Sequence, residues 1–151
     1  MFSRSAGYAI QALTYLAAQP PGKLTGAREI AEEAQMPMPF LWKILRNLSQ
    51  KKLVRSFKGV RGGYELARAA EKISVRQVLA ASPDGRHTDD CVLGLDQCNE
   101  SAPCPLHESW KTVRSQIDDL LKETSLADLA RNARRRESKR ANLQSTRKSA
   151  G

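Results

Sequence analysis

The stretch from residue 36 to residue 67, MPMPFLWKILRNLSQKKLVRSFKGVRGGYELA, decides the fold. Its first half predicts a helix, because apolar residues recur at helical spacing and two prolines fall within the expected first turn. Its second half changes period and predicts two short strands, near residues 53–57 and 64–67. A glycine-rich tip, KGVRGG, joins them. The stretch therefore predicts a helix followed by a β-hairpin.

Two shorter helical patterns precede this stretch. Residues 5–19 predict a first helix that Ser5 caps and that ends before the pair Pro20–Pro21. Residues 24–35 predict a second helix with Thr25 as its N-cap. The connection AQMPM is short enough to hold the second and third helices at an angle. The predicted fold class is mainly α with a small β-hairpin wing, a winged helix-turn-helix followed by a long dimerisation helix.

The second half of the chain predicts that long helix. A short helix is expected over 74–82, and residues 83–105 show no periodicity. From His107 onward, apolar residues recur at the spacing of a seam between two helices. They are Trp110, Val113, Ile117 and Leu120. The predicted organisation is a winged-helix domain (1–82), a cysteine-rich loop (83–106), a dimerisation helix with a short last helix (107–130) and a basic disordered tail (131–151).

Charge is distributed unevenly along the 151 residues, whose formal net charge is +9. Residues 22–63 hold nine Lys and Arg against three acidic residues, 64–130 hold seven against twelve, and 131–151 hold eight against one. Clustered basic side chains indicate a polyanionic partner such as DNA, although a solvated basic face has the same composition. With no apolar run near the roughly 20 residues that span a bilayer and no signal-like start, the chain is expected in the cytoplasm, without a membrane partner.

A winged helix places its third helix in the major groove of double-stranded DNA and its wing in a minor groove. Lys43 and Arg46 suit phosphates or guanine edges, and Pro39 and Phe40 suit thymine methyl groups. Basic residues beside glycines suit a wing tip that approaches a groove wall. The candidate DNA-binding residues are Thr25, Pro39, Phe40, Trp42, Lys43, Arg46, Asn47, Lys58, Gly59 and Arg61.

All three cysteines lie in one segment, with the spacing C-x6-C-x5-C-x2-H formed by Cys91, Cys98, Cys104 and His107. Three thiolates and one imidazole suit an iron–sulfur cluster or a zinc ion. The spacing is that of neither a zinc ribbon nor a haem attachment motif. Three thiols in a loop, with or without redox activity, are compatible with the same residues. An odd cysteine count without an export signal indicates a reducing compartment.

Three features taken together resemble the Rrf-type winged-helix regulators of bacteria, the IscR- and NsrR-like iron–sulfur regulators. They are Ser5, Tyr8 and Ala9 near the start, the wing KGVRGGYELA, and the pattern CVLG…C…PCPLHESW. The resemblance extends from residue 1 to near residue 130. It implies a homodimer on a palindromic operator, and an iron–sulfur cluster, [2Fe–2S] in preference to [4Fe–4S], that the three cysteines and His107 hold. Lys58 falls where related wings often carry an arginine.

The sequence departs from the family pattern near its start and in the third helix. The nitric-oxide sensors take a fourth ligand from an aspartate near the N-terminus; Gly7 stands at that place, which favours His107 as the ligand. The third helix carries Pro39, Trp42 and Lys43 where the iron–sulfur regulator is polar and acidic, so a different operator is expected.

The predicted function is sequence-specific transcriptional regulation in which an iron–sulfur cluster controls DNA affinity, in response to iron, cluster status or redox or nitrosative stress. The alternative is a cluster-free regulator that senses oxidants through thiols or through zinc. A small redox enzyme or electron carrier could use Cys104 and His107, but no acidic orienting residue or cofactor loop accompanies them. The protein is therefore predicted not to be an enzyme.

Overall fold

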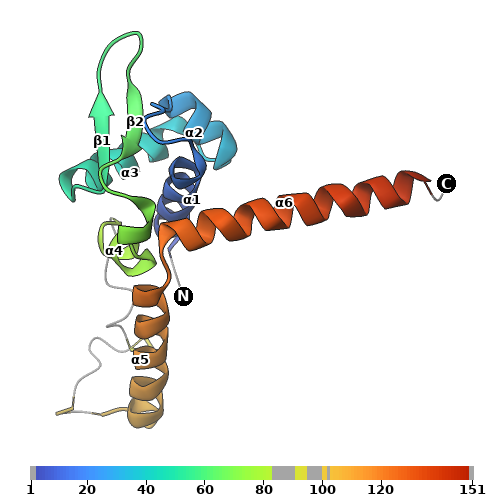
Figure 1. Cartoon of the computed structure of the whole chain (residues 1–151). Coiled ribbons are helices and arrows are strands. Elements are labelled where there is room, and N and C mark those ends of the chain that lie inside the picture. Colours follow the sequence, from blue (N-terminus) through green and yellow to red (C-terminus); the bar gives the residue numbers. More distant parts are fainter. Residues whose placement is uncertain (1–2, 83–90, 95–99, 102, 150–151) are drawn as a thin grey trace.

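The computed structural model describes residues 3–82, 91–94, 100–101 and 103–149. Its elements follow the predicted order of three helices, a hairpin, a short helix and a long helix (Figure 1). This architecture confirms the prediction of a mainly α fold with a small β-hairpin wing, a winged helix-turn-helix. The elements are α1 (Arg4–Ala18), α2 (Ala27–Glu33), α3 (Met38–Gln50), β1 (Val54–Phe57), β2 (Gly63–Leu66), the 3₁₀ turn η1 (Ala70–Lys72), α4 (Val75–Ala80), α5 (His107–Glu123) and α6 (Leu126–Ser149).

Helix α1 is central to the body, because it contacts α2, α3, α4, α6 and β2. The main core fills the space between these elements. Its largest fully buried side chains include Leu13 of α1, Ile30 of α2 and Leu126 of α6. Burial of apolar surface on this scale is the main force that holds the elements together. Helix α3 contributes its predicted inner face, Leu41, Ile44, Leu45 and Leu48.

The starts of the first two helices differ from the prediction. Ser3, and not Ser5, caps α1, and its hydroxyl accepts a hydrogen bond from the Ala6 amide at 3.1 Å. The N-cap of α2 is Gly26, with no side-chain cap, and the Thr25 side chain is buried. The prediction of Thr25 as a cap was wrong because the Thr25 backbone pairs with Tyr64 of the wing, which takes its side chain out of capping position. At α3, Pro37 and Pro39 occupy the helix start as predicted.

The hairpin is antiparallel, and its register pairs Val54 with Leu66 and Phe57 with Gly63. Val54 is buried and the other three residues of β1 are exposed. The hairpin projects beyond the helices, so its glycine-rich turn lies at one end of the molecule (Figure 1).

Helix α5 extends from the body on the side opposite the wing (Figure 1). A second cluster of buried residues joins it to α1 and α4 through Ala6, Val75, Leu79 and Leu121. Arg76 of α4 also forms an ion pair with Asp118 of α5, and Lys122 contacts the same carboxylate at 2.6 Å. These two cations hold the pKa of Asp118 below its usual value, mainly through the Lys122 hydrogen bond. The base of α5 is thus held against the winged-helix body by both apolar and ionic contacts.

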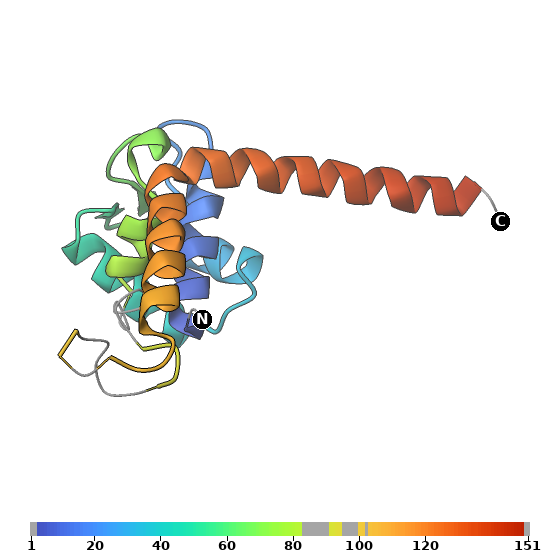
Figure 2. The same cartoon turned by 90° about the horizontal axis from the view of Figure 1, so that it is seen from below.

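Helix α6 corrects the predicted end of the chain. It continues to Ser149 instead of ending near Ala130, where a disordered tail was predicted. Figures 1 and 2 show its second half leaving the body. The prediction relied on the scarcity of large apolar residues, but residues 131–149 have no glycine or proline and include eight Arg and Lys, which are strong helix formers. Among the residues that the structure describes, no helix is long and apolar enough to cross a membrane.

Candidate nucleic-acid interface and cysteine segment

Helix α3 presents aromatic and basic side chains on the exposed half of its surface, away from its buried apolar residues. Phe40 is 51% exposed and Trp42 is 60% exposed, values that are unusual for large aromatic side chains in a monomer. Lys43 and Arg46 are exposed beside them. At about 100° per residue, Lys43 and Arg46 point outward between Phe40 at one edge of the exposed face and Trp42 at the other. The predicted division of α3 into an inner and an outer face is confirmed.

The start of α3 is supported by α1. The ring of Tyr8 lies 6.4 Å from that of Phe40, at a tilted angle typical of aromatic pairs. Pro39 is exposed and Asn47 is partly exposed. The predicted α3 residues thus all retain accessible surface on one element.

A groove of about 560 Å³ separates α3 from the wing. The α3 side of the groove includes Trp42, Lys43 and Arg46, and the wing contributes Ser56 and Tyr64. Inspection of the sequence did not identify Ser56 or Tyr64 as site residues. The alternation of β1 could have indicated Ser56, because only Val54 of that strand is buried.

The wing tip is exposed from Lys58 to Arg61. Lys58, Gly59 and Arg61 are exposed as predicted, and Val60, between them, is fully exposed. Gly59 has φ +103°, a left-handed conformation that residues with a Cβ rarely adopt, so the turn requires a glycine there. Thr25, the remaining predicted DNA contact, is buried and does not reach this surface.

Helices α1 and α2 are joined by a polar cluster. The Tyr15 hydroxyl donates to a Glu29 carboxylate oxygen at 2.8 Å, and Lys23 donates to the same oxygen at 2.9 Å. The Glu29 hydrogen bond raises the pKa of Tyr15 to about 12. The Lys23 hydrogen bond, followed by that from Tyr15, lowers the pKa of Glu29. The cluster fixes α2 against α1, and α2 in turn supports α3.

The predicted metal ligands lie at and before the start of α5. Cys91 is 8% exposed, Cys104 is partly buried, and His107 is 5% exposed. The His107 amide donates to the Cys104 carbonyl at 2.9 Å, so these two residues share one turn of backbone. Cys98 lies outside the described residues. Within the described ranges, no three His, Cys, Asp or Glu side chains gather as metal ligands would.

A salt bridge connects the cysteine segment to α5. Lys111 of α5 contacts Glu100 at 2.7 Å. This hydrogen bond lowers the pKa of Glu100 and raises that of Lys111. The Cys91 and Cys104 sulfurs and the His107 imidazole, which are partly or fully shielded from water, are ligand types that suit soft metal centres. The described residues therefore include suitable metal ligands but do not bring three of them together at one site.

The comparisons with known proteins agree with this architecture. The profile of the Rrf2 family, iron-dependent transcriptional regulators, matches residues 2–132. A predicted HTH-type transcriptional regulator of Aquifex aeolicus is 37% identical over 131 residues, which cover 85% of this chain and 90% of the relative.

Solved structures show the same fold. The global cysteine regulator CymR of B. subtilis matches with a TM-score of 0.75 at 23% identity, covering 87% of this chain and 97% of CymR. IscR of T. potens matches with a TM-score of 0.70 at 25% identity, covering 88% of each chain. The helix-turn-helix architecture and the family match together indicate DNA binding and not enzymatic activity. The chain therefore belongs to the Rrf2 family of transcriptional regulators.

Proposed function

We propose that this regulator binds a palindromic operator as a homodimer and that an iron–sulfur cluster in its cysteine segment sets its affinity for DNA. The observation that carries the DNA-binding part is the exposed outer face of α3 beside the wing. Two large aromatic side chains and two cations lie on this face. Trp42 and the two cations also line the groove between α3 and the wing. Such exposure is costly in water, and contact with a partner removes the cost.

In this proposal α3 enters the major groove. Lys43 and Arg46 donate to phosphates or to guanine O6 and N7, and Asn47 donates to and accepts from base edges. Pro39, Phe40 and Trp42 supply apolar surface for thymine methyl groups and sugars. The Tyr8 ring behind Phe40 limits the orientations of that side chain, which favours a defined contact.

The wing contacts the neighbouring minor groove. Lys58 and Arg61 bring positive charge to the tip, where the negative potential of a narrow minor groove attracts cations. Gly59 lets the backbone turn without a side chain between the tip and the groove wall. The two contacts together define one half-site.

The face of α5 supports a homodimer. Leu106, Val113 and Leu120 stand seven residues apart, and each is at least 44% exposed. Trp110 and Ile117, partly buried, lie between them at the alternate positions of a seam. A second copy of α5 carries an apolar stripe of the same spacing and is therefore the partner that we propose for this face. A two-fold axis along this seam would relate two α3 helices, as a palindrome requires.

The family description as iron-dependent regulators supports the choice of iron over zinc. We assign Cys91, Cys98, Cys104 and His107 as the ligands, with [2Fe–2S] in preference to [4Fe–4S]. Bound there, such a cluster would supply a group whose charge and ligation depend on the redox state and the supply of iron. The proposed ligands include the first residue of α5, the same helix that carries the proposed dimer seam.

Contacts within the chain connect the cysteine segment to the winged-helix body that carries α3. Lys111 holds Glu100 of the cysteine segment on α5, and Asp118, further along α5, pairs with Arg76 of α4. A change in the position of the start of α5 is therefore transmitted to the body that carries α3. Since the two winged-helix bodies of the homodimer must fit two half-sites at once, a small change in the angle between them changes operator affinity.

Sequence selection from random duplexes tests the DNA-binding part. The wild-type protein should enrich a palindrome and bind it at least about a thousandfold more tightly than competitor DNA. Trp42→Ala and Arg46→Ala should relax the selected sequence, while Glu123→Ala, an exposed residue at the C-terminal end of α5, serves as a control and should not. Failure to enrich any sequence would contradict the proposal.

Iron and acid-labile sulfide analysis of anaerobically purified protein tests the cluster. A visible spectrum with bound iron and sulfide is expected, and Cys98→Ala should lose all three. Zinc without sulfide, or reversible thiol oxidation without any metal, would instead support the cluster-free alternative.

A further inference from the structure

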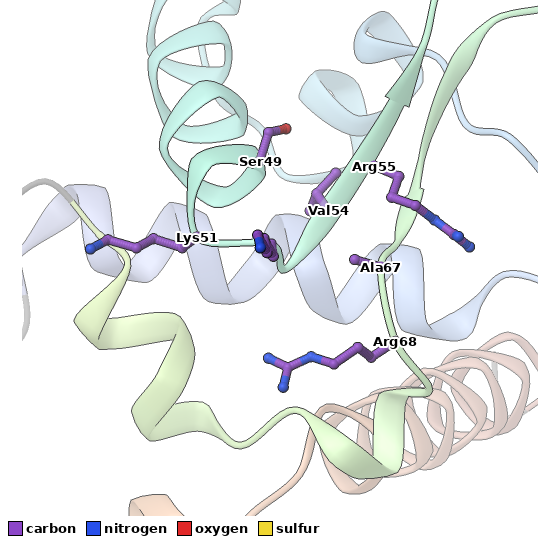
Figure 3. Close-up of a pocket in the computed structure, with 7 residues that line it drawn as sticks. Ser49, Lys51, Val54, Arg55, Ala67 and Arg68 are labelled. Carbon is purple, nitrogen blue, oxygen red and sulfur yellow. The ribbon is translucent and has the colours of Figure 1, made fainter.

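A second depression, of about 650 Å³, lies where α3 ends and β1 begins (Figure 3). Four of the residues around it are cationic and exposed, and no carboxylate lines it. We call it the basic pocket. Its lining residues are Ser49, Lys51, Lys52, Val54, Arg55, Ala67 and Arg68.

The cations of the basic pocket are not equivalent. Arg55 pairs with Glu65 of the opposite strand at 2.9 Å, which neutralises it. Figure 3 shows the Arg55 side chain pointing to one side of β1, and those of Lys51 and Arg68 pointing to the other. Lys51, Lys52 and Arg68 form no ion pair with any residue that the structure describes. Their charge is therefore available to an anion.

The backbone of Lys52 provides an independent observation. Lys52 has φ +56°, at the C-terminal cap of α3. Its amide donates to the Ser49 carbonyl at 3.0 Å, and the Leu53 amide donates to that of Leu48 at 2.9 Å, which together form a Schellman motif. Glycine fits this position best, since a Cβ strains the left-handed conformation. A cation occupies a site where glycine would give the more stable fold.

The basic pocket continues the groove between α3 and the wing, because Ser49 lines both. Given the proposed function, a DNA strand leaving the groove past Arg46 next meets Lys51 and Lys52. We infer that the basic pocket binds a backbone phosphate beside the half-site, with Lys51, Lys52 and Arg68 as its donors. This contact reads no base, and it fixes the register of α3 in the groove.

Lys52→Gly separates folding from binding. The variant should unfold roughly 2–4 °C above wild type, because it relieves backbone strain. Its affinity for the operator should fall about 25- to 100-fold at 0.1 M salt, and the magnitude of the slope of log K against log salt should fall by about 1.8, as expected when one phosphate contact is lost in each half-site of the homodimer. Lys52→Arg, which keeps the charge, should bind as wild type does.

A matched control exists in α2. Gln35 has φ +48° in the same type of cap, with the Met36 amide donating to the Ala31 carbonyl at 3.0 Å. Gln35→Gly should therefore raise the unfolding temperature as Lys52→Gly does, and leave the salt slope unchanged. An equal loss of affinity in both variants would show that cap rigidity, not charge, matters at Lys52.

The outcomes distinguish this inference from the proposed function. If wild type binds the operator specifically while Lys52→Gly keeps its affinity and salt slope, the phosphate contact is wrong and the regulator stands. If wild type shows no preferred sequence, the proposed function fails first. A free phosphate ion is the other ligand that the same three cations could bind, and titration with inorganic phosphate in the absence of DNA tests for it. Saturable phosphate binding that Lys52→Gly abolishes, with DNA binding unchanged, would overturn the DNA contact in favour of a free anion.

Discussion

Thr25 and Tyr64 join the wing to the helix-turn-helix through two backbone hydrogen bonds. The Thr25 amide donates to the Tyr64 carbonyl at 2.9 Å, and the Tyr64 amide donates to the Thr25 carbonyl at 2.8 Å. This bridge extends the hairpin by a short third segment at the entrance to α2. The position of the wing relative to α3 thus depends on a residue far away in the sequence.

Gly63 makes this close approach possible. A Cβ at position 63 would lie 2.8 Å from the Thr25 carbonyl oxygen, where the neighbouring atoms are backbone and cannot rotate away. Gly63→Ala should therefore destabilise the fold by about 1–3 kcal/mol, as overpacking does. It should also weaken operator binding, because the wing shifts. Urea unfolding and anisotropy titration measure the two effects, and Gly7→Ala in α1, where a Cβ would meet no atom within 4 Å, is the control that should not destabilise the fold.

The Tyr15–Glu29 hydrogen bond predicts a stability change at alkaline pH. Because the folded protein raises the pKa of Tyr15 from 10.0 to about 12, the bond contributes fully below pH 10, and its contribution is lost as the pH rises through 12. Tyr15→Phe should cost about 1 kcal/mol at pH 8. The difference between variant and wild type in urea unfolding should shrink between pH 10 and pH 12. A difference that stays constant over that range would contradict the assignment.

Leu120 tests the dimer. It is 62% exposed on α5, so Leu120→Glu should leave the fold of each subunit intact. A charge in an apolar seam should nevertheless disrupt pairing, and analytical ultracentrifugation should show monomers. Ser115→Glu, on the exposed opposite face of α5, should remain dimeric. Monomers in both variants, or dimers in both, would place the interface elsewhere.

The basic end of α6 predicts a uniform effect on DNA affinity. Residues 137–151 contain four Lys and Arg and one acidic residue. Their removal should weaken binding to operator and competitor DNA by the same factor and lower the salt slope, since phosphate attraction carries no sequence information. A truncated protein that loses its preference for the operator would show that α6 takes part in recognition.

The sequence predicted those parts of the fold that local patterns determine. The leucine spacing and prolines of α3 and the glycine-rich tip of the wing each specify a local structure, and all three occur. The features that the sequence did not predict correctly depend on contacts between residues far apart in the chain. Thr25 has an ideal N-cap side chain, but its pairing with Tyr64 overrides local preference. The basic pocket depends on the fold bringing Arg68 near the end of α3, which no spacing reveals.

The cysteine segment was predictable only in part. The donor types and the placement of His107 at the start of α5 were predictable from composition and periodicity, and the structure agrees on that helix start. Assembly of the ligands depends on Cys98, which lies outside the described residues.

The central claim, that the cluster sets operator affinity, is tested most directly by one anaerobic titration. The same preparation is titrated with its selected operator as purified, after iron chelation, and after reconstitution with iron and sulfide. The proposal predicts an affinity change of about tenfold or more that reconstitution reverses, and a Cys98→Ala protein that remains at the chelated value throughout. Equal operator affinity in the iron-loaded and iron-free protein would contradict it.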